Sequence, residues 1–513
     1  MTDNPVVGFE KRTIALTGDP WMCRHFYLQF SMVLDIRYFF ILGVDTVWDS
    51  EYGFFEKDPK ITVMSFRASM ILEQKLMLVL CCKHTERQPC DILFFNRGLE
   101  WGKEYVDELY VLQYFRHQSH IVLEEKELWI FGAGNNGRYF YEKYKNIFHI
   151  GGFISNFEEE QQCQGLPVIR PSAVLQKKDS YVVICSDADE VMAEQLGRLG
   201  LKGGRDFSFA ELLPIRLFIA VGICQIIKTA ETLGMNEEFS LRYHSAFFLE
   251  NAYESYHDAD NRRLKGYGCF CDAVLYNIAN AGMTELRNYE PLLDRYYKKA
   301  VRFHLPFYSF KGQLPQATDD VNPYALREIK AYAGRHFWFR GDQEINRMAE
   351  QGCTEEEILD QILSDDYWSD QEIRENFSRE MKKIGLLDRF SSFPVRPFVE
   401  EHYQSILIFL DGTHFSGQLC RYLANEIAVA LHIPPSGASE TENEGENSRT
   451  GVMPVYPCVR RVLGINRGDT YQFYDPEHDR MEYLDVKTYA AKYIRYTAGA
   501  RSIQEELGTI MAY

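Results

Sequence analysis

Residues 126–137, KELWIFGAGNNG, place an apolar run directly before Gly132, Gly134 and Gly137. The run has the composition of a buried strand, and the residues after the glycines, RYFYEKYKNIF, have helical spacing. A strand, a glycine turn and a helix are the opening of a βαβ unit. Three further apolar segments predict that a small parallel sheet follows: IGGFIS at 150–155, LPVI at 166–169 and SYVVICS at 180–186.

The region before this unit repeats its plan. TIALTGDPWMCRHFYLQF at 13–30 matches the strand, turn and helix of residues 128–144, and residues 61–82 match 166–186 in order and spacing. We therefore predict two tandem Rossmann-like lobes, over 1–120 and 121–214, the alternative being that two α/β units of similar length look alike by chance. The first lobe keeps only Gly18 of the glycine pattern, so we expect it to bind nothing.

From residue 215 the pattern changes to strands separated by long helices, which predicts a third and larger α/β domain over 215–513. The stretch at 435–451, PSGASETENEGENSRTG, is polar and acidic and predicts a mobile loop. Strand candidates include 217–222, 239–248 and 405–411, and helix candidates include 369–387 and 416–432.

The composition excludes several classes of protein. The net charge of −18, from 74 acidic and 56 basic side chains, repels nucleic acid and anionic membrane surfaces. No apolar run is long enough to span a bilayer and the amino terminus does not resemble a signal peptide, so we expect a cytoplasmic protein. The 12 cysteines lack the spacing of metal knuckles or redox dithiols, so we expect reduced thiols and no metal site. The oligomeric state cannot be read from the sequence.

The glycine turn of the second lobe has two interpretations. Backbone at Gly132, Gly134 and Gly137 can approach a pyrophosphate at a helix amino terminus, which predicts a nucleotide or sugar-nucleotide site. However, Ser155 and Asn156 stand where an acidic residue would hold a ribose, so the glycines can instead serve the turn alone. By its FGAGNNG and GFISN motifs the lobe resembles the nucleotide-binding lobes of bacterial sugar-modifying enzymes.

A second strand, glycine and helix combination occurs at 218–234, FIAVGICQIIKTAETLG, and presents Cys224 at the start of the helix. A helix amino terminus lowers the pKa of a thiol placed there and offers N–H groups to a developing oxyanion. The alternative is that Cys224 is one more small buried residue, as free cysteines often are.

Downstream, FLDGTHFSGQ at 409–418 places Asp411 and His414 at the end of a predicted strand. With Cys224 they give the chain order nucleophile, acid, base, and Asn277 at another strand end is the candidate oxyanion donor. This arrangement resembles that of the SGNH (GDSL-like) esterases. Together with the two lobes before it, it predicts an α/β fold class: two tandem small Rossmann-like lobes followed by a larger SGNH- or flavodoxin-like α/β domain rich in helices.

Residues 215–435 also resemble the WcbI-type polysaccharide-biosynthesis family through VGICQ, CDAVLYN, FYSFKGQLPQ, EIRENFSREMKKIGLLDRF and the segment Asp411 to Gln418. The resemblance implies that Gly222, Cys224, Gln225 and His414 line a cleft that binds coenzyme A. It further implies acetyl transfer from acetyl-CoA to a sugar hydroxyl in capsule or surface-polysaccharide synthesis. Two residues depart from the family's pattern, since Ile223 replaces an Asn and Asn277 replaces a Gln.

Two other functions use the same features. An esterase or deacetylase would use the same side chains with water as the acceptor. A non-catalytic module would sense nucleotide or coenzyme A within a glycan-synthesis complex. His244 and His257 either line the same cleft or are hydrogen-bonded structural residues.

Overall fold

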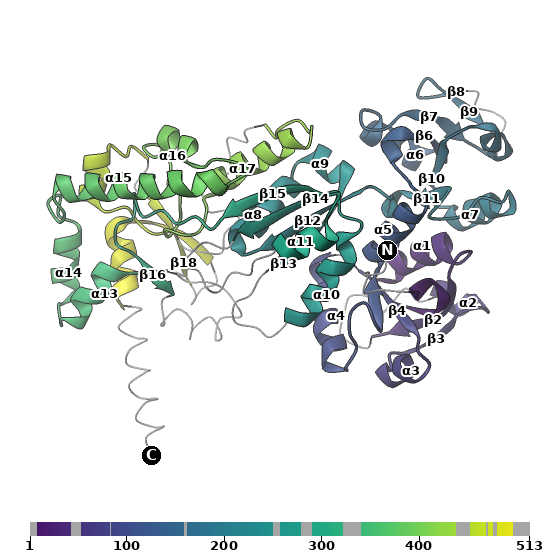
Figure 1. Cartoon of the computed structure of the whole chain (residues 1–513), viewed down its shortest axis with the longest axis horizontal. Helices are drawn as coiled ribbons and strands as arrows, with labels where there is room; N and C mark the ends of the chain where they lie inside the picture. Colours follow the sequence, from purple (N-terminus) through teal and green to yellow (C-terminus); the bar gives the residue numbers. More distant parts are fainter. Residues whose placement is uncertain are drawn as a thin grey trace, which may run out of the picture. The chain divides into compact units, whose positions relative to one another are not determined.

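The computed structural model describes residues 8–42, 53–82, 84–157, 162–249, 257–278, 290–321, 340–437, 452–467, 470–475 and 480–495 (Figure 1). The chain divides into two compact units. Unit 1 holds Met1–Ile219, Glu237–Val274 and Tyr289–Val301, and unit 2 holds Ala220–Asn236, Leu275–Asn288 and Arg302–Tyr513. The domain boundaries at 120 and 214 stay predictions, and the loop predicted at 435–451 lies outside the described residues from 438 onward.

The first sheet of unit 1 has five parallel strands built around β1 (Thr13–Gly18). Its order is β3-β2-β1-β4-β5. The central strands are continuous apolar runs, with Leu16, Leu78 and Val79 fully buried, because helices cover a parallel sheet on both faces. The other strands are β2 (Asp35–Ile41), β3 (Thr62–Ser65), β4 (Met77–Cys81) and β5 (Tyr105–Asp107).

The second sheet of unit 1 is built around β6 (Glu127–Phe131) in the order β11-β10-β6-β7-β9-β8. Its pairs are parallel except for the short pair of β8 with β9. From β6 the chain builds outward through β7 and β9 and then crosses to β10 and β11, as it does from β1 in the first sheet. The two sheets therefore share one strand order. The other strands are β7 (Ile150–Ile154), β8 (Gln162–Cys163), β9 (Leu166–Ile169), β10 (Ser180–Ile184) and β11 (Phe207–Phe209).

A four-stranded sheet follows in the order β13-β12-β14-β15. Its strands are β12 (Arg216–Gly222), β13 (Tyr243–Leu249), β14 (Ala273–Ile278) and β15 (Val301–Pro306). The predicted strand at 239–248 begins later than expected, because its first residues belong to helix α9 (Glu237–Arg242), which buries Phe239 and Leu241. The three sheets confirm the predicted α/β class.

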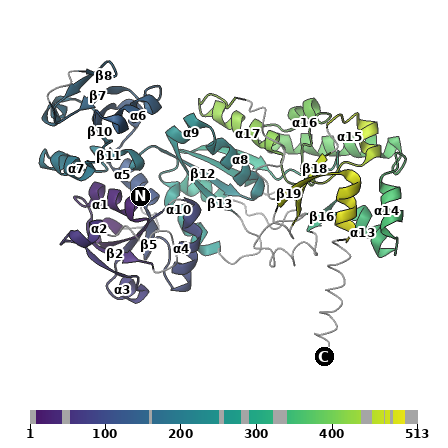
Figure 2. The same ribbon diagram turned by 180° about the vertical axis from the view of Figure 1, so that it is seen from behind.

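Unit 2 is rich in helices, as expected from the sequence. Two predicted helices are confirmed as α15 (Asp370–Leu387) and α17 (Gly417–Ala430). Ser369 caps α15 with a reciprocal hydrogen bond to Glu372, and Ser416 caps α17 by accepting from the N–H of Leu419 at 3.2 Å. In both views α15 lies beside α16 (Arg396–His402) (Figures 1 and 2).

The apolar stretch at 405–411 is not the strand that its composition predicts. Ile406 to Leu410 are buried, but their backbone groups bond to side chains and loops. Gln313 accepts from the N–H of Ile408 at 2.9 Å and donates to the carbonyl of Ile406 at 2.7 Å. Burial, rather than pairing in a sheet, explains the apolar run.

The remaining helices complete the two units. None of the described helices is both long and apolar enough to cross a lipid bilayer. In unit 1 they are α1 (Pro20–Phe30), α2 (Gly53–Lys57), α3 (Ala68–Glu73), α4 (His84–Asn96), α5 (Glu108–Gln118), α6 (Asn135–Tyr144), α7 (Asp189–Arg198), α10 (His257–Gly268) and α11 (Glu290–Tyr296). Unit 2 adds α8 (Cys224–Gly234), α13 (Gln343–Glu350), α14 (Glu355–Ile362) and α18 (Pro457–Leu463), with the strand pairs β16 (Ala317–Val321) and β17 (Arg340–Asp342), and β18 (Thr470–Asp475) and β19 (Arg480–Asp485).

Candidate functional site

The turn from β12 into α8 presents Cys224 at the first position of a helix of 11 residues. Gly222 has φ of +150°, and a Cβ on it would lie 2.3 Å from Oδ1 of Asn277. Only glycine is therefore compatible with this close approach. The Cys224 side chain is exposed, so a small molecule can reach the thiol.

Asn277 fixes the backbone of this turn. Its Oδ1 accepts from the N–H of Ile223 at 2.9 Å, and its Nδ2 donates to the carbonyl of Leu305 at 3.2 Å. The side chain is only 1% exposed. Asn277 thus joins the end of β14 to the turn that carries the thiol and to β15, and its predicted role as an oxyanion donor stays a prediction.

Gln225, the residue after the thiol, is buried and joins α8 to two loops. Its Nε2 donates to the carbonyls of Tyr308 and Thr413, both at 2.6 Å, and its Oε1 accepts from the N–H of Tyr308 at 3.2 Å. These bonds hold Thr413, the neighbour of His414, against the start of α8. The role in coenzyme A binding that the sequence implies for Gln225 stays a prediction.

Asp411 and His414 form a compact turn. Nδ1 of His414 lies 2.7 Å from Oδ2 of Asp411, and Oδ1 of Asp411 accepts from the N–H groups of Thr413 at 3.0 Å and His414 at 2.9 Å. The carbonyl of His414 accepts from the N–H of Leu410 at 2.8 Å. Because Asp411 holds Nδ1, the other ring nitrogen, Nε2, is left to exchange a proton with a neighbour.

An electrostatic interaction and a side-chain hydrogen bond connect His414 of this pair to Cys224. Burial alone would lower the pKa of His414, but the charge of Asp411 and the charge and hydrogen bond of the Cys224 thiol raise that pKa well above its ordinary 6.5. Burial would raise the pKa of Asp411, yet His414 and the backbone N–H groups lower it to about 2. The three side chains that the sequence places in order are therefore in contact as Asp411, His414 and Cys224.

Most of the other cysteine side chains are buried and so are inaccessible to a substrate. Nine of the 12 thiols are buried, and Cys269 is the second exposed one. Cys420, which lies near Cys224, is buried, and burial raises its pKa to about 12. None of the 12 cysteines forms a disulfide bond, and the described residues hold no cluster of three or more side chains suited to a metal ion.

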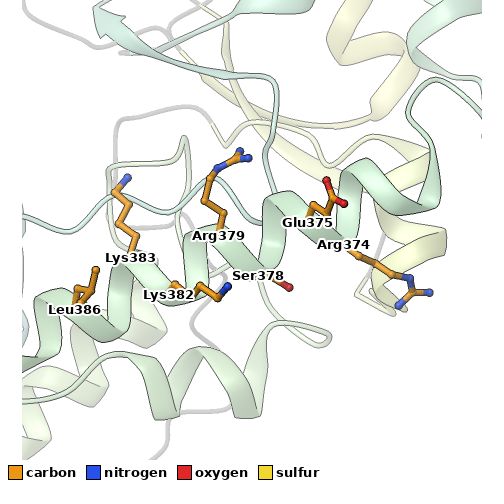
Figure 3. A pocket seen from close by; sticks show the side chains of 7 residues that line it. All are labelled: Arg374, Glu375, Ser378, Arg379, Lys382, Lys383 and Leu386. Atoms are coloured by element: carbon orange, nitrogen blue, oxygen red, sulfur yellow. The ribbon is translucent and has the colours of Figure 1, made fainter.

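A shallow groove of about 570 Å³ runs along α15 in the same unit. Figure 3 shows Arg374, Arg379, Lys382 and Lys383 projecting from this helix, with Glu375 as the one acidic side chain among them. The helix touches the segment that follows Tyr308, since Lys383 donates to Oγ of Ser309 and Glu380 accepts from the N–H of Lys311 at 3.0 Å. The sequence of residues 369–387 predicted a helix, but it did not predict a basic groove along that helix.

Two of the three glycines of the second lobe are required by the backbone geometry of the turn. Gly132 has φ of +124°, and a Cβ on Gly137 would lie 1.7 Å from the carbonyl oxygen of Gly132. A Cβ on Gly134, by contrast, would meet nothing within 4 Å. Nucleotide binding at this turn therefore stays a prediction that rests on the open space at Gly134.

The structure describes the side chain of one of the two candidate histidines. His244 lies in unit 1, where its Nε2 is 2.7 Å from the carbonyl oxygen of Leu213. The side chain of His257 lies outside the described residues.

Comparison with known proteins gives one distant structural likeness. No family model and no curated protein matches the chain. The chain resembles WcbI. That solved structure is described as a polysaccharide biosynthesis enzyme, in a native form without a disulfide bond between coenzyme A and a cysteine. The match has a TM-score of 0.41 and 14% identity, and covers 55% of this chain and 89% of WcbI. No role is transferred from WcbI to this chain at such values.

Proposed function

We propose that unit 2 carries an acyltransferase that moves an acetyl group from acetyl-CoA to a sugar hydroxyl in capsular or surface-polysaccharide biosynthesis, on an SGNH-like layout. The observation that supports this proposal most is the continuous contact from Asp411 through His414 to Cys224. A carboxylate, an imidazole and a thiol in contact form the arrangement that activates a cysteine nucleophile.

Each residue has a defined task in the proposed reaction. The Cys224 thiolate attacks the carbonyl carbon of the donor thioester, and the leaving sulfur takes a proton from His414. His414 next takes the proton of the sugar hydroxyl, while the sugar oxygen attacks the acetyl group on Cys224 and the bond from carbon to Sγ breaks. The thiolate beside a protonated His414 is then restored, and Asp411 keeps the imidazole oriented throughout.

The negative charge that develops on the carbonyl oxygen has donors at the start of α8. The first N–H groups of a helix have no partner within the helix, and they carry partial positive charge. The N–H groups of Cys224 and Gln225 occupy these positions. Asn277 supports them by holding Ile223, and its predicted direct contact with the oxyanion is part of the proposal.

The groove along α15 is suited to the phosphate groups of a coenzyme A donor. Its lining holds four cations and one carboxylate in a chain with a net charge of −18, and cations attract phosphate. We therefore assign the phosphate end of the donor to this groove.

The exposure of Cys224 favours hydrolysis as the second candidate function, because water then has access to the acyl group. A non-catalytic module that binds nucleotide or coenzyme A is the third, and it is favoured by the apolar Ile223 beside the thiol.

One experiment separates these functions. The full chain is incubated with acetyl-CoA, with and without sugar nucleotides and methyl glycosides, and released coenzyme A thiol and acetylated sugar are measured. Transfer requires acceptor-dependent release together with an acetylated sugar. Release that yields only acetate identifies an esterase, and no release beyond that of Cys224→Ala leaves a binding module.

A further inference from the structure

Unit 1 contains a cavity of about 730 Å³, and no residue of the thiol site is among those that line it. It opens where β10 and β11 end, at Asp187 and Glu211, and includes Asn136 of the glycine-turn helix α6. Order in the sheet reverses between β6 and β10, and ligands of open parallel sheets bind outside the carboxyl ends of the strands at such a point. A cavity of this volume accommodates a small organic molecule.

One wall of the cavity comes from α1 and holds an unpartnered polar atom. Asp189 accepts two hydrogen bonds from Arg24, both at 2.6 Å, and lies 2.8 Å from Nε2 of His25. The His25 side chain is only 5% exposed, and its Nδ1 is buried without a hydrogen-bond partner. Buried ring nitrogens normally have hydrogen-bond partners, and this one is an exception within the wall of the cavity.

The polar groups of the cavity include acceptors on three side chains. Burial lowers the pKa of His244 to about 4, so its imidazole is neutral, with Nε2–H donating to Leu213. The carboxylates of Asp187 and Glu211 add further acceptors. A ligand that fits must therefore supply several donors.

Cations able to hold a phosphate are scarce in this cavity. Arg24 is already paired with Asp189, and the Nζ of Lys143 lies over the ring of Tyr144 at 5.6 Å from its centroid. With Asp187 and Glu211 nearby, a phosphate would meet repulsion.

Aromatic side chains supply flat apolar surfaces. Trp21 is 45% exposed and Tyr139 is 70% exposed, and both line the cavity. Trp21 is held by an edge contact with His25, with ring centroids 4.2 Å apart. A ligand with an apolar ring face and hydroxyl donors around its edge matches aromatic walls combined with acceptors.

We propose that this cavity is a binding site for an uncharged hexopyranose, in which hydroxyl groups donate to His244, Asp187 and Glu211 while a ring face packs on Trp21 or Tyr139. The site requires no phosphate. It goes beyond the transferase reaction, because none of its residues belongs to the thiol site.

The test is saturation-transfer NMR and titration on the full chain with methyl glycosides of glucose, galactose, mannose and N-acetylglucosamine, and with uridine diphosphate as the charged rival. We expect at least one glycoside to bind through its ring protons. Trp21→Ala and Tyr139→Ala, at exposed positions where the fold tolerates change, should weaken it by about tenfold. Phe157→Ala, at an exposed aromatic side chain outside the cavity, is the matched control and should leave binding unchanged.

The proposal is overturned if no glycoside binds, if both aromatic variants bind as the wild type does, or if uridine diphosphate alone binds. Binding that persists in Cys224→Ala assigns the sugar to the unit 1 cavity. Binding that is lost in Cys224→Ala places it at the thiol site and contradicts the inference, whatever the outcome for acetyl transfer.

Discussion

Nδ1 of His414 lies 2.7 Å from Oδ2 of Asp411, three residues earlier on the same buried turn. The same carboxylate accepts two backbone N–H groups through its other oxygen. The turn therefore fixes both the orientation of the imidazole and the nitrogen that faces away from Asp411.

Replacing Asp411 by Asn should lower the pKa of His414. The negative charge that raises this pKa is removed, while the burial that lowers it remains. NMR titration of the His414 ring protons in the wild type and in Asp411→Asn measures the change. An identical titration in the two proteins would show that Asp411 does not act on His414.

The stability of unit 2 should depend on pH through this pair. The folded pKa of Asp411, about 2, lies below its ordinary 3.8, so its contribution is complete above 3.8 and is lost as the pH falls toward 2. The raised pKa of His414 contributes fully below 6.5 and is lost as the pH rises through the folded value. Denaturant unfolding of the wild type should show a loss of about 2 kcal/mol of unfolding free energy as the pH falls from above 3.8 to about 2. The loss should be much smaller in Asp411→Asn.

Cys224→Ala, His414→Ala and the double variant should reduce turnover to a similar floor. Residues that act as one unit are strongly non-additive, because either loss removes the same step. Asp411→Asn should cost less, since the base remains. Steady-state rates with acetyl-CoA test this, and additive losses would mean that His414 only binds substrate. If Cys224 only packs, its replacement costs about 1 kcal/mol of stability and leaves the rate unchanged.

Gly222→Ala should destabilise the chain by about 1 to 3 kcal/mol, because a Cβ there would overlap Asn277 on a backbone with positive φ. Gly234→Ala, at the other end of α8, is the matched control, since a Cβ there meets nothing within 4 Å. Denaturant midpoints compare the two variants. Equal stabilities would contradict the close approach at Gly222.

Gly134→Val should remove any nucleotide-dependent rise in melting temperature while the fold is kept, because the added side chain fills open space above the turn. Thermal unfolding at millimolar nucleotide measures this effect. No rise in the wild type would leave the glycines with a structural role alone.

The sequence predicts the turns better than it predicts the long-range partners. Glycines after apolar runs located both strand-to-helix turns, since close backbone approach restricts the residue type. The spacing of Asp411 and His414 predicted their contact because three residues suffice for a turn. The pairing of Asp189 with Arg24 and His25 joins residues more than 160 positions apart, and no local pattern records it.

Two errors have a common cause. The apolar side chains of 239–242 and 405–411 are buried, among them Phe239, Leu241 and Leu407, and burial does not specify which backbone groups these residues bond. In the second stretch the side chain of Gln313 takes the bonds that a neighbouring strand would have made, and a single glutamine far along the chain gives no periodic signal.

Gln225 donates to the carbonyl of Thr413 across 188 residues of chain. During synthesis the amino-terminal part of a protein leaves the ribosome first, so β12 and its thiol emerge long before the turn that carries His414. In the proposed enzyme, Cys224 lacks its base, His414, until that turn docks on Gln225. The contact between Cys224 and His414, on which the proposed reaction depends, therefore forms late in the maturation of the protein.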